Sequence, residues 1–304
     1  MNELTRRVLF AVVAAPVAIW AILAGGAPLA AMLAVVSALG AWEFFRIARA
    51  GGATPLSGAG IAIAGLVPLA VHAHYLQVYS LPLAVPAVAV LALCAAAIWA
   101  RGVHGKPLAA IATTVLGVAY TGVMLSFGYA LRYHGYVRGF DGAPGIGGVS
   151  VSGREWRLSL GGLLLLLPIL LTWASDIGAY FVGRAFGRRK LIPSVSPGKT
   201  IAGAVGGLLA SIVVAWIYVR FVLQPVGQLT LSPVGVIVFG LVVSVAAQVG
   251  DLFESLLKRE AGVKDSSRLL PGHGGILDRF DSLIFVLPVA YLLVGWLLRA
   301  APHG

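Results

Sequence analysis

The stretch from Val234 to Leu298 decides the fold, because it sets a charged segment between two apolar runs. It is VGVIVFGLVVSVAAQV-GDLFESLLKREAGVKDSSRLLPGHGGILDRFD-SLIFVLPVAYLLVGWLL, with hyphens after residues 249 and 281. Apolar runs of this length are typical of membrane-spanning helices. The middle segment holds six of the chain's eleven acidic residues, namely Asp251, Glu254, Glu260, Asp265, Asp278 and Asp281. The pattern indicates a polar site at a membrane surface.

The composition agrees with a membrane protein. The chain has 304 residues, of which 59% are hydrophobic and 11% charged, whereas soluble domains have about 25% charged residues. Long apolar runs recur from end to end, and the alternation typical of a β-barrel is missing. We therefore predict an all-α polytopic integral membrane protein.

Nine stretches are apolar enough to span a bilayer, taking about 18 to 20 residues per span. They are 7–25, 27–45, 58–79, 81–100, 108–131, 159–183, 203–223, 232–256 and 281–299. With the N-terminus in the cytoplasm, 16 of the 22 Lys and Arg residues fall on the cytoplasmic side. This asymmetry predicts an N-in, C-out topology. Because the basic residues lie in short loops, the net charge of +11 does not indicate nucleic-acid binding.

The spans divide the chain into two predicted regions. Residues 1–135 form an N-terminal region of about five spans, and residues 159–304 form a C-terminal region of about four spans. The first span follows Arg6-Arg7 and resembles a signal peptide. A second apolar run follows it directly, which favours an uncleaved span. Most polar residues of the C-terminal region fall in two expected cytoplasmic loops, 184–202 and 257–280.

The sixth span contains an acidic residue within its apolar run. Asp176 is followed at four-residue steps by Tyr180 and Arg184, so all three share one helix face. A direct pair between Asp176 and Arg184 is disfavoured, because eight residues extend about 12 Å along a helix. We therefore favour a functional role for Asp176. Glu43, the only acid of the first five spans, lies three residues before Arg46, and a structural ion pair is the favoured interpretation there.

A basic segment precedes the seventh span. The sequence Ser196-Pro-Gly-Lys199-Thr200 suggests a P-loop, but that motif needs a glycine at position 193, where this chain has Pro193. It also needs a preceding strand. Lys199 and Thr200 instead stand where a helix is expected to begin, and donors at a helix N-terminus suit a phosphate.

The carboxylates near the membrane need compensation. Each costs on the order of 3 kcal/mol in hydrocarbon, so Asp176, Asp251, Asp278 and Asp281 require water, basic partners or metal ions. Asp278 and Asp281 are three residues apart and project from one helix face if the last span begins there. Oxygen ligands favour a hard divalent cation such as Mg²⁺, which shares its coordination with substrate phosphates. The glycines around His273 and the nearby cations suit a phosphate as well. Together they predict phosphoryl or nucleotidyl transfer.

Two motifs in this half resemble the phosphatidate cytidylyltransferase family, the membrane CDP-diacylglycerol synthases. The first runs from Ser255-Leu-Leu-Lys258-Arg259 through Leu270-Pro-Gly-His273-Gly274-Gly275 to Asp278-Arg279-Phe-Asp281. The second comprises Asp176, Tyr180, Gly183-Arg184, Gly187 and Ser196 to Thr200. The resemblance covers about 100 residues, 173–281. The chain departs from the pattern after Thr200, since Ala202 stands where the family usually has a glutamate.

The resemblance implies an activity and a site. CTP and phosphatidic acid would give CDP-diacylglycerol and pyrophosphate, with Mg²⁺ as cofactor and a second, monovalent cation such as K⁺ beside it. The implied metal ligands are Asp251, Asp278 and Asp281. Asp176, Lys199 and Lys258 join them as the implied catalytic residues, with Asp176 as a substrate-orienting carboxylate. The phosphates would be bound by Arg184, Ser196, Lys199, Thr200, Lys258, Arg259, His273, Gly274, Gly275 and Arg279.

The resemblance also implies partners and a location. We expect a homodimer in the inner membrane, embedded in the lipid bilayer, with its active site facing the cytoplasm. Two other classes of function remain open from the residues alone. Buried carboxylates also occur in ion-coupled transporters, although here they cluster towards one face and no repeated half is evident. A CTP-dependent lipid kinase would need the same cations and phosphate contacts.

Overall fold

The computed structural model describes residues 3–78, 84–135, 148–151, 154–270 and 274–301. Its described part is mainly helical and forms two compact units. The first unit comprises residues 1–21, 26–129 and 256–280, and the second comprises residues 22–25, 130–255 and 281–304. The segment 256–280 thus packs with the N-terminal helices, although the sequence groups it with the C-terminal spans.

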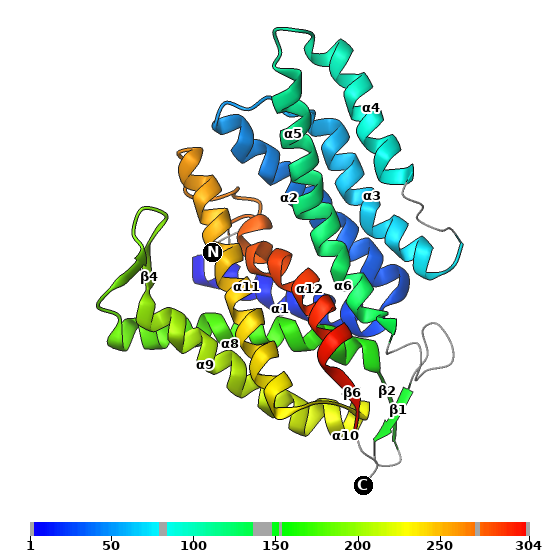
Figure 1. Ribbon diagram of the computed structural model, residues 1–304, viewed down its shortest axis with the longest axis vertical. Coiled ribbons are helices and arrows are strands. Elements are labelled where there is room, and N and C mark those ends of the chain that lie inside the picture. Colours follow the sequence, from blue (N-terminus) through cyan, green and yellow to red (C-terminus); the bar gives the residue numbers. More distant parts are fainter. Residues whose placement is uncertain (1–2, 79–83, 136–147, 152–153, 271–273, 302–304) are drawn as a thin grey trace. The chain divides into compact units, whose positions relative to one another are not determined.

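The first unit is a group of long helices (Figure 1). They are α1 (Glu3–Ala24), α2 (Gly26–Ala50), α3 (Ser57–Tyr75), α4 (Ala84–Arg101), α5 (Pro107–Gly117) and α6 (Met124–Arg132). A π-helical turn, Val118–Val123, joins α5 to α6 in one continuous helix. Helices α2 and α3 pack against each other and against this π-helical turn, and α4 packs on α5.

Glycines let these helices approach closely around one aromatic ring. Phe45 of α2 is fully buried. A Cβ atom added to Gly60 of α3 or to Gly117 of α5 would lie 2.4 Å from its ring. Only a bare backbone fits at either position. Thr114 of α5 also accepts a hydrogen bond from the backbone N–H of Leu56 at 2.8 Å, which ties the start of α3 to α5.

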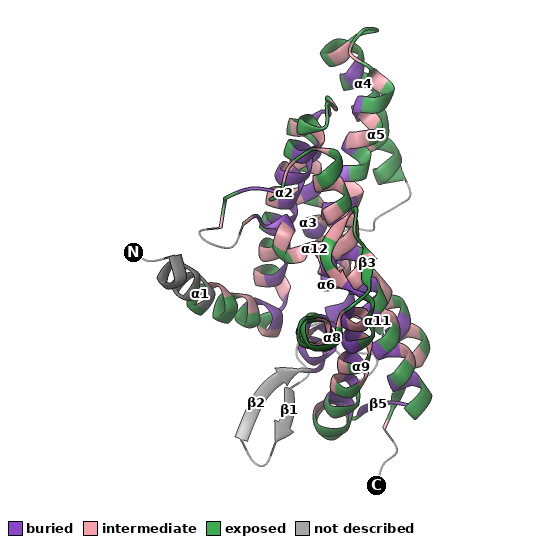
Figure 2. Cartoon of the chain, turned by 90° about the vertical axis from the view of Figure 1, so that its left-hand side faces the viewer, coloured by how far each residue is buried: buried purple, intermediate pink, exposed green. Residues whose placement is uncertain are grey.

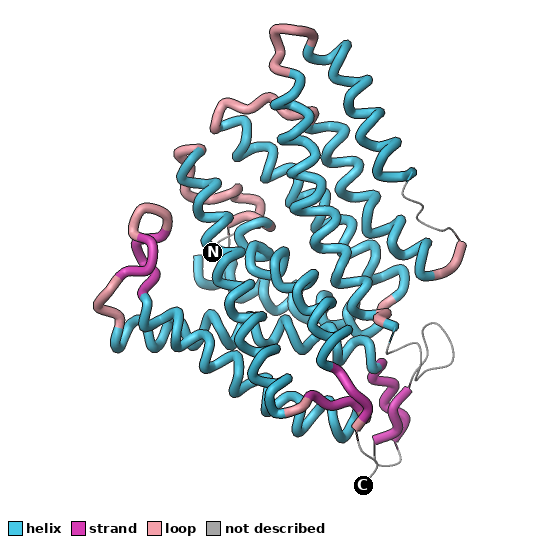
Figure 3. The backbone as a smooth tube through the Cα atoms, in the orientation of Figure 1, coloured by secondary structure: helices cyan, strands magenta, loops and turns pink. Residues whose placement is uncertain are grey.

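The second unit combines four long helices with short hairpins. The helices are α8 (Leu160–Phe186), α9 (Ile201–Tyr218), and most of α11 (Pro233–Glu260) and α12 (Leu277–Leu297), whose residues 256–260 and 277–280 belong to the first unit. The π-helical segment Val219–Leu223 leads from α9 into α10 (Gln224–Gly227). The described strands form three antiparallel pairs, which Figure 3 draws in magenta. They are β1 (Gly148–Val151) with β2 (Arg154–Ser159), β3 (Lys190–Ile192) with β4 (Ser196–Thr200), and β5 (Leu229–Leu231) with β6 (Leu298–Ala300). The β3–β4 hairpin, which the sequence does not predict, connects α8 to α9.

Most of the predicted spans are confirmed. Eight described helices are long and apolar enough to cross a membrane: 26–50, 57–75, 84–101, 107–132, 160–186, 201–227, 233–260 and 277–297. Each corresponds to one of the expected stretches. The first expected span coincides with α1, of which only the part Val12–Ala24 counts as an apolar helix among the described residues. The total of nine spans and the N-in orientation therefore stay predictions.

Large apolar side chains cover the outer faces of these helices. Leu209, Val213 and Trp216 of α9 are each more than half exposed, and exposed residues run along α9 and α11 in Figure 2. A water-soluble protein would hide such a surface, whereas lipid accepts it. Inside the second unit, by contrast, Ser175 and Ser244 join α8 to α11 by a buried hydrogen bond of 2.7 Å.

Helices α8 and α9 depend on small residues at their contact. A Cβ atom on Gly206 would lie 2.4 Å from the Cβ of Val182, which real structures do not allow. We expect Gly206→Ala to lower the free energy of unfolding by about 1–3 kcal/mol, as overpacked cores do. Thermal unfolding in detergent would measure this effect. Gly58→Ala of α3 is the matched control, since nothing lies within 4 Å of that position; equal stability of both variants would contradict the packing argument.

Candidate active site

A cavity of about 580 Å³ lies in the second unit, where α8, the β3–β4 hairpin, α9 and α11 meet. This volume is in the range of small-molecule sites. Its polar lining combines two carboxylates with three cations and three neutral groups: Asp176, Asp251, Arg184, Lys190, Lys199, Tyr180, Thr200 and Gln248. The structure thus gathers five of the predicted site residues, Asp176, Arg184, Lys199, Thr200 and Asp251, around one cavity.

Thr200 fixes the start of α9 beside this cavity. Its side chain accepts a hydrogen bond from the backbone N–H of Gly203 at 3.1 Å, so Thr200 is the N-cap residue. The expected helix N-terminus is therefore confirmed. Gly187 of the α8–β3 turn and Gly203 make room for this cap, since a Cβ atom at either would lie 2.6 and 3.0 Å from the Thr200 hydroxyl. The glycines bring bare backbone to the wall of the cavity.

Lys199 and Asp251 form an ion pair across the cavity. The ammonium nitrogen lies 2.7 Å from a carboxylate oxygen, and the two side chains are 25% and 37% exposed. The Lys199 ammonium nitrogen itself is buried, and both partners line the cavity, where a ligand can replace either of them. Gln248, one turn before Asp251, donates to the carbonyl of Ala204 at 3.2 Å and holds α11 against α9.

The predicted stripe on α8 is confirmed. Asp176, Tyr180 and Arg184 all line the cavity. The guanidinium of Arg184 donates to the Tyr180 hydroxyl at 3.0 Å, in keeping with the expectation that it does not pair with Asp176. The stripe presents an acid at one end and a base at the other, which suits a ligand with both metal-binding and phosphate groups.

Asp278 lies in the first unit and is held by a separate set of contacts. One carboxylate oxygen lies 2.7 Å from the ammonium of Lys258. The other accepts from the backbone N–H groups of Ser266 and Gly275 at 3.1 and 2.8 Å, and it lies 2.8 Å from the Ser266 hydroxyl, whose single proton is shared with Glu43. The Asp278 and Lys258 side chains are only 11% and 13% exposed. Asp278 is therefore tightly oriented.

Glu43 is a buried residue whose role the sequence does not reveal. Its expected pair with Arg46 is wrong: the carboxylate, fully buried, accepts hydrogen bonds from the hydroxyls of Ser266 and Ser267 and from the backbone N–H groups of Ile276 and Leu277. These partners are more than 220 positions away in the sequence, so no spacing rule could have found them.

The glycines after residue 273 pack against these carboxylates. Gly274 has a φ of +79°, which favours glycine. A Cβ atom on Gly275 would lie 2.5 Å from a carboxylate oxygen of Glu43 and 2.0 Å from the hydroxyl of Ser266. The glycines are therefore required by the turn itself. Their predicted contact with phosphate stays a prediction, and His273 lies outside the described residues.

Asp281 belongs to the second unit, as does Asp251. Helices α11 and α12 meet there at Gly250, where a Cβ atom would lie 2.6 Å from the backbone carbonyl of Asp281. The side chain of Asp281 accepts from the backbone N–H of Ser282 at 2.6 Å. Along α12, Asp281 follows Asp278 by three residues, so both carboxylates lie in the first two turns of one helix, as expected.

The donor set suits Mg²⁺. Among the described residues, no three His, Cys, Asp or Glu side chains are grouped closely enough to enclose a metal ion. Mg²⁺ needs no such cage, because one or two carboxylates, water and substrate phosphate complete its coordination. Asp251 already binds a cation, the Lys199 ammonium, at 2.7 Å. The residues present fit a divalent ion whose coordination is completed by water or by substrate phosphate.

Three remaining predicted residues lie outside the cavity lining. Ser196 is half-buried at the start of β4. Arg259 is exposed in the last turn of α11, and Arg279 is exposed in the first turn of α12. Lys190, by contrast, lines the cavity although the sequence predicts only a topological role for it. Its position follows from the hairpin, where it pairs with Thr200 in register.

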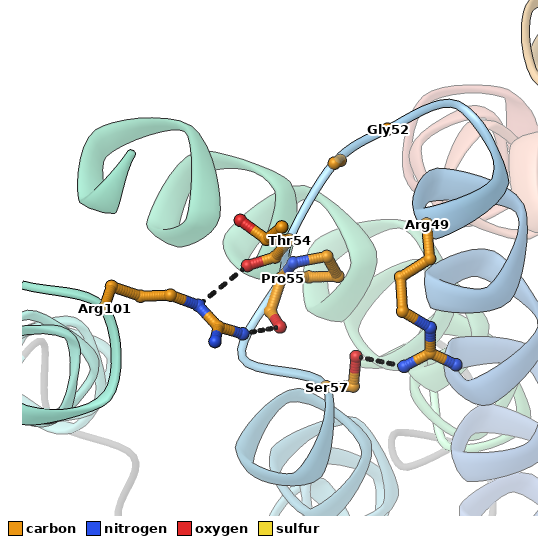
Figure 4. Close-up of a pocket in the computed structure, with 7 residues that line it drawn as sticks. Arg49, Gly52, Thr54, Pro55, Ser57 and Arg101 are labelled. Carbon is orange, nitrogen blue, oxygen red and sulfur yellow. Dashed lines mark hydrogen bonds between the residues drawn. The ribbon is translucent and has the colours of Figure 1, made fainter. Parts of the chain in front are cut away.

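A second cavity of about 550 Å³ in the first unit has a different character (Figure 4). Arg101 donates to the backbone carbonyls of Thr54 and Pro55 at 3.0 and 2.6 Å, and Arg49 donates to the Ser57 hydroxyl at 2.8 Å. These arginines hold the 51–57 turn between α2 and α3. No carboxylate lines this cavity, so it lacks the combination of groups found in the second unit.

Apolar helices that surround carboxylates, cations and a capped helix N-terminus define a membrane protein with a polar cavity. The comparison with known families specifies it further. Residues 5–297 match the model of the cytidylyltransferase family. The chain therefore belongs to the cytidylyltransferase family, and the resemblance inferred from its motifs is confirmed at that level.

Individual relatives agree with this assignment. The chain is 32% identical over 305 residues to a phosphatidate cytidylyltransferase of Synechocystis, and the alignment covers 97% of each protein. It is 51% identical over 129 residues to a phosphatidate cytidylyltransferase of Haemophilus influenzae, and 49% identical over 125 residues to one of Bacillus subtilis. These two alignments cover only 44% and 45% of those relatives.

Proposed function

We propose that the protein transfers the cytidylyl group of CTP to phosphatidic acid, giving CDP-diacylglycerol and pyrophosphate. The observation that carries the proposal is the Lys199–Asp251 pair in a cavity at the N-terminus of α9. It offers a cation and a helix end to phosphates, and a carboxylate to a metal. Membership of the cytidylyltransferase family and the names of the relatives support the choice of substrates.

The reaction requires no nucleophile from the protein. A phosphate oxygen of phosphatidic acid attacks the α-phosphorus of CTP, and the bond to the pyrophosphate oxygen breaks. Both substrates are anionic, so their repulsion is a large part of the barrier. Lys199 and Arg184 neutralise phosphate charge at fixed positions, and Asp176 orients the substrate. Lys258 is assigned a similar phosphate contact.

We propose Asp251, Asp278 and Asp281 as the residues that hold Mg²⁺, with a monovalent cation such as K⁺ as a second ion. Because the described side chains form no closed group of three ligands, water and substrate phosphate would complete the coordination. When bound, the divalent ion would neutralise charge that develops on the transferred phosphoryl group. Lys199 and Lys258 pair with two of these carboxylates at 2.7 Å. Each lysine is therefore placed to exchange a carboxylate for a phosphate oxygen.

The location follows from the substrates and the charge distribution. We propose that the protein is a homodimer of the inner membrane whose site faces the cytoplasm, where CTP is found. Phosphatidic acid would enter laterally from the bilayer. The excess of Lys and Arg on the expected cytoplasmic side supports this orientation.

Product analysis tests the proposal against its two rivals. Purified protein is incubated with phosphatidic acid, Mg²⁺ and CTP labelled at either the α- or the γ-phosphate. We expect label from the α-phosphate to appear in lipid and label from the γ-phosphate to appear in pyrophosphate. A lipid kinase would instead transfer the γ-label to lipid and leave the α-label in CDP, with no pyrophosphate formed. A transporter would show neither, but would give Asp251-dependent ion flux in proteoliposomes.

Lys199 provides a test of phosphate binding. We expect Lys199→Ala to lower kcat/KM for CTP by roughly 10- to 100-fold, because a charged hydrogen bond contributes about 1.5–3 kcal/mol. Initial rates at varied CTP would measure this change. Lys106→Ala is the control, since Lys106 is an exposed residue at the start of α5. Unchanged kinetics in Lys199→Ala would remove Lys199 from the site.

A further inference from the structure

Glu43 is a buried carboxylate that the proposed reaction does not use. It lies on α2 with none of its surface exposed. Placing a carboxylate inside a protein is costly unless it is fully hydrogen-bonded. An apolar residue of similar size would usually serve packing at least as well. Its burial here therefore needs a reason beyond the stability of α2.

The four groups that donate to Glu43 lie in the connection between α11 and α12 and at the first residue of α12. One oxygen accepts from the Ser267 hydroxyl and from the backbone N–H of Ile276 at 2.9 Å. The other accepts from the Ser266 hydroxyl at 2.9 Å and from the backbone N–H of Leu277 at 2.6 Å. Glu43 thus binds both ends of this connection and caps the first turn of α12 from another helix.

The Ser266 hydroxyl links Glu43 directly to Asp278. It lies 2.9 Å from one carboxylate and 2.8 Å from the other. Its backbone N–H also donates to Asp278 at 3.1 Å. Gly275, whose N–H binds Asp278, lies against Glu43 so closely that a Cβ atom there would be 2.5 Å from the carboxylate. Two of the groups that orient Asp278 are therefore set in place by Glu43.

From these contacts we infer that Glu43 is a positioning residue: by fixing Ser266 and Gly275, it holds the Asp278 carboxylate in the orientation that binds a divalent cation. The inference rests on the proposed function in one respect, namely that Asp278 is a metal ligand. Groups that orient a metal ligand typically change metal affinity by about 10- to 100-fold. Glu43 acts through its neighbours and is not itself assigned to the metal or the substrate.

Glu43→Gln tests this role with little change in size. Its amide nitrogen replaces one acceptor and would face a backbone donor, so at least one of the four hydrogen bonds is lost. We expect a folded protein whose Mn²⁺ dissociation constant, measured by electron paramagnetic resonance without nucleotide, rises about 10- to 100-fold. The Mg²⁺ concentration for half-maximal activity should rise in parallel. Glu260→Gln, an exposed glutamate at the end of α11, is the matched control.

Hydrogen exchange reports the local change independently of activity. Peptides that cover residues 264–270 and 274–277 should exchange faster in Glu43→Gln, whereas peptides from the apolar part of α2 should be unchanged. Faster exchange with an unchanged Mn²⁺ constant would make Glu43 purely structural and overturn the inference. Unchanged exchange together with unchanged metal binding would overturn it as well.

If Glu43→Gln does not fold, a pair of serine variants tests whether Glu43 orients Asp278 through Ser266. Ser266→Ala removes the hydroxyl that contacts both carboxylates, whereas Ser267→Ala removes a hydroxyl that donates to Glu43. We expect the Mn²⁺ constant to rise more in Ser266→Ala than in Ser267→Ala. Equal constants in both variants and the wild type would exclude transmission through Ser266.

The outcomes separate this inference from the proposed function. Wild-type protein that binds Mn²⁺ but transfers no label from CTP would refute the proposed reaction, while the metal constants and exchange rates would still decide the role of Glu43. Wild-type protein that transfers label normally, with a Glu43→Gln variant unchanged in metal dependence, would refute only the inference.

Discussion

Asp251→Asn is expected to lower kcat by about 1000-fold, while the protein still inserts and folds. Loss of one fixed charge at a reacting phosphate typically costs about 10²–10³ in rate. Asp251 carries two roles that an amide cannot fill: it is a proposed metal ligand and it binds the Lys199 ammonium at 2.7 Å. Initial rates at saturating CTP, phosphatidic acid and Mg²⁺ would measure the change.

The controls for Asp251→Asn address both its folding and its rivals. The Asp251 side chain is 37% exposed and asparagine has the same size, so the variant should still fold, and thermal unfolding checks this. Glu260→Gln should keep the wild-type rate, since Glu260 is exposed and lies outside the cavity. A purified Asp251→Asn variant with near wild-type turnover would exclude Asp251 from the metal site.

The spans could be predicted because length and hydropathy are local properties of the chain. The start of helix α12 is not predicted by these local properties. The last expected span begins at residue 281, itself an acidic residue, whereas the helix begins at Leu277. The extra turn forms because Glu43 and Asp278 accept hydrogen bonds from the backbone at its start. That capping depends on tertiary contacts that hydropathy does not encode.

The candidate site likewise contains residues that the sequence predicts and residues that it does not. The stripe Asp176, Tyr180 and Arg184 was predictable, because helical periodicity alone puts these side chains on one face. Thr200 was predictable as a helix start for a similar reason. Lys190 was missed because it reaches the cavity through β3, a strand of three residues with too little pattern to detect.

The partners of Glu43 could not be predicted from residue spacing. The neighbouring Arg46 suggested a local pair, yet the carboxylate binds residues 223 to 234 positions away. Such a residue becomes visible only when the fold brings α2 to the connection between α11 and α12 within the first unit. Local rules favour the nearest opposite charge, whereas burial favours whichever partners supply enough donors.

Asp278→Asn is expected to lower kcat about 1000-fold. A Lys258 variant is needed to interpret this loss, because Lys258 pairs with Asp278. The Asp278 carboxylate accepts from Lys258, Ser266 and Gly275, all at 2.7–3.4 Å. An amide at this position loses the charge that a metal needs. Its NH₂ group would also face a neighbouring donor, where the carboxylate oxygen now accepts. We expect Lys258→Met alone to lower kcat about 100-fold.

A double-mutant cycle distinguishes two roles for Lys258. If Lys258 and Asp278 act as one unit in catalysis, the double variant should be no slower than Asp278→Asn alone, because groups that act together are strongly non-additive. If Lys258 binds phosphate independently of Asp278, the two losses should multiply to about 10⁵. Rates from single-turnover experiments with α-labelled CTP would cover this range.

The cycle also tests whether the pair is merely structural. Both side chains are nearly buried, so removal of one partner leaves an uncompensated charge and should lower the melting temperature. Removal of both should restore most of that stability. If stability returns in the double variant while turnover does not, the Lys258–Asp278 pair is required for the reaction itself. If turnover returns together with stability, Asp278 supports the fold alone, and the metal assignment must be withdrawn for this residue.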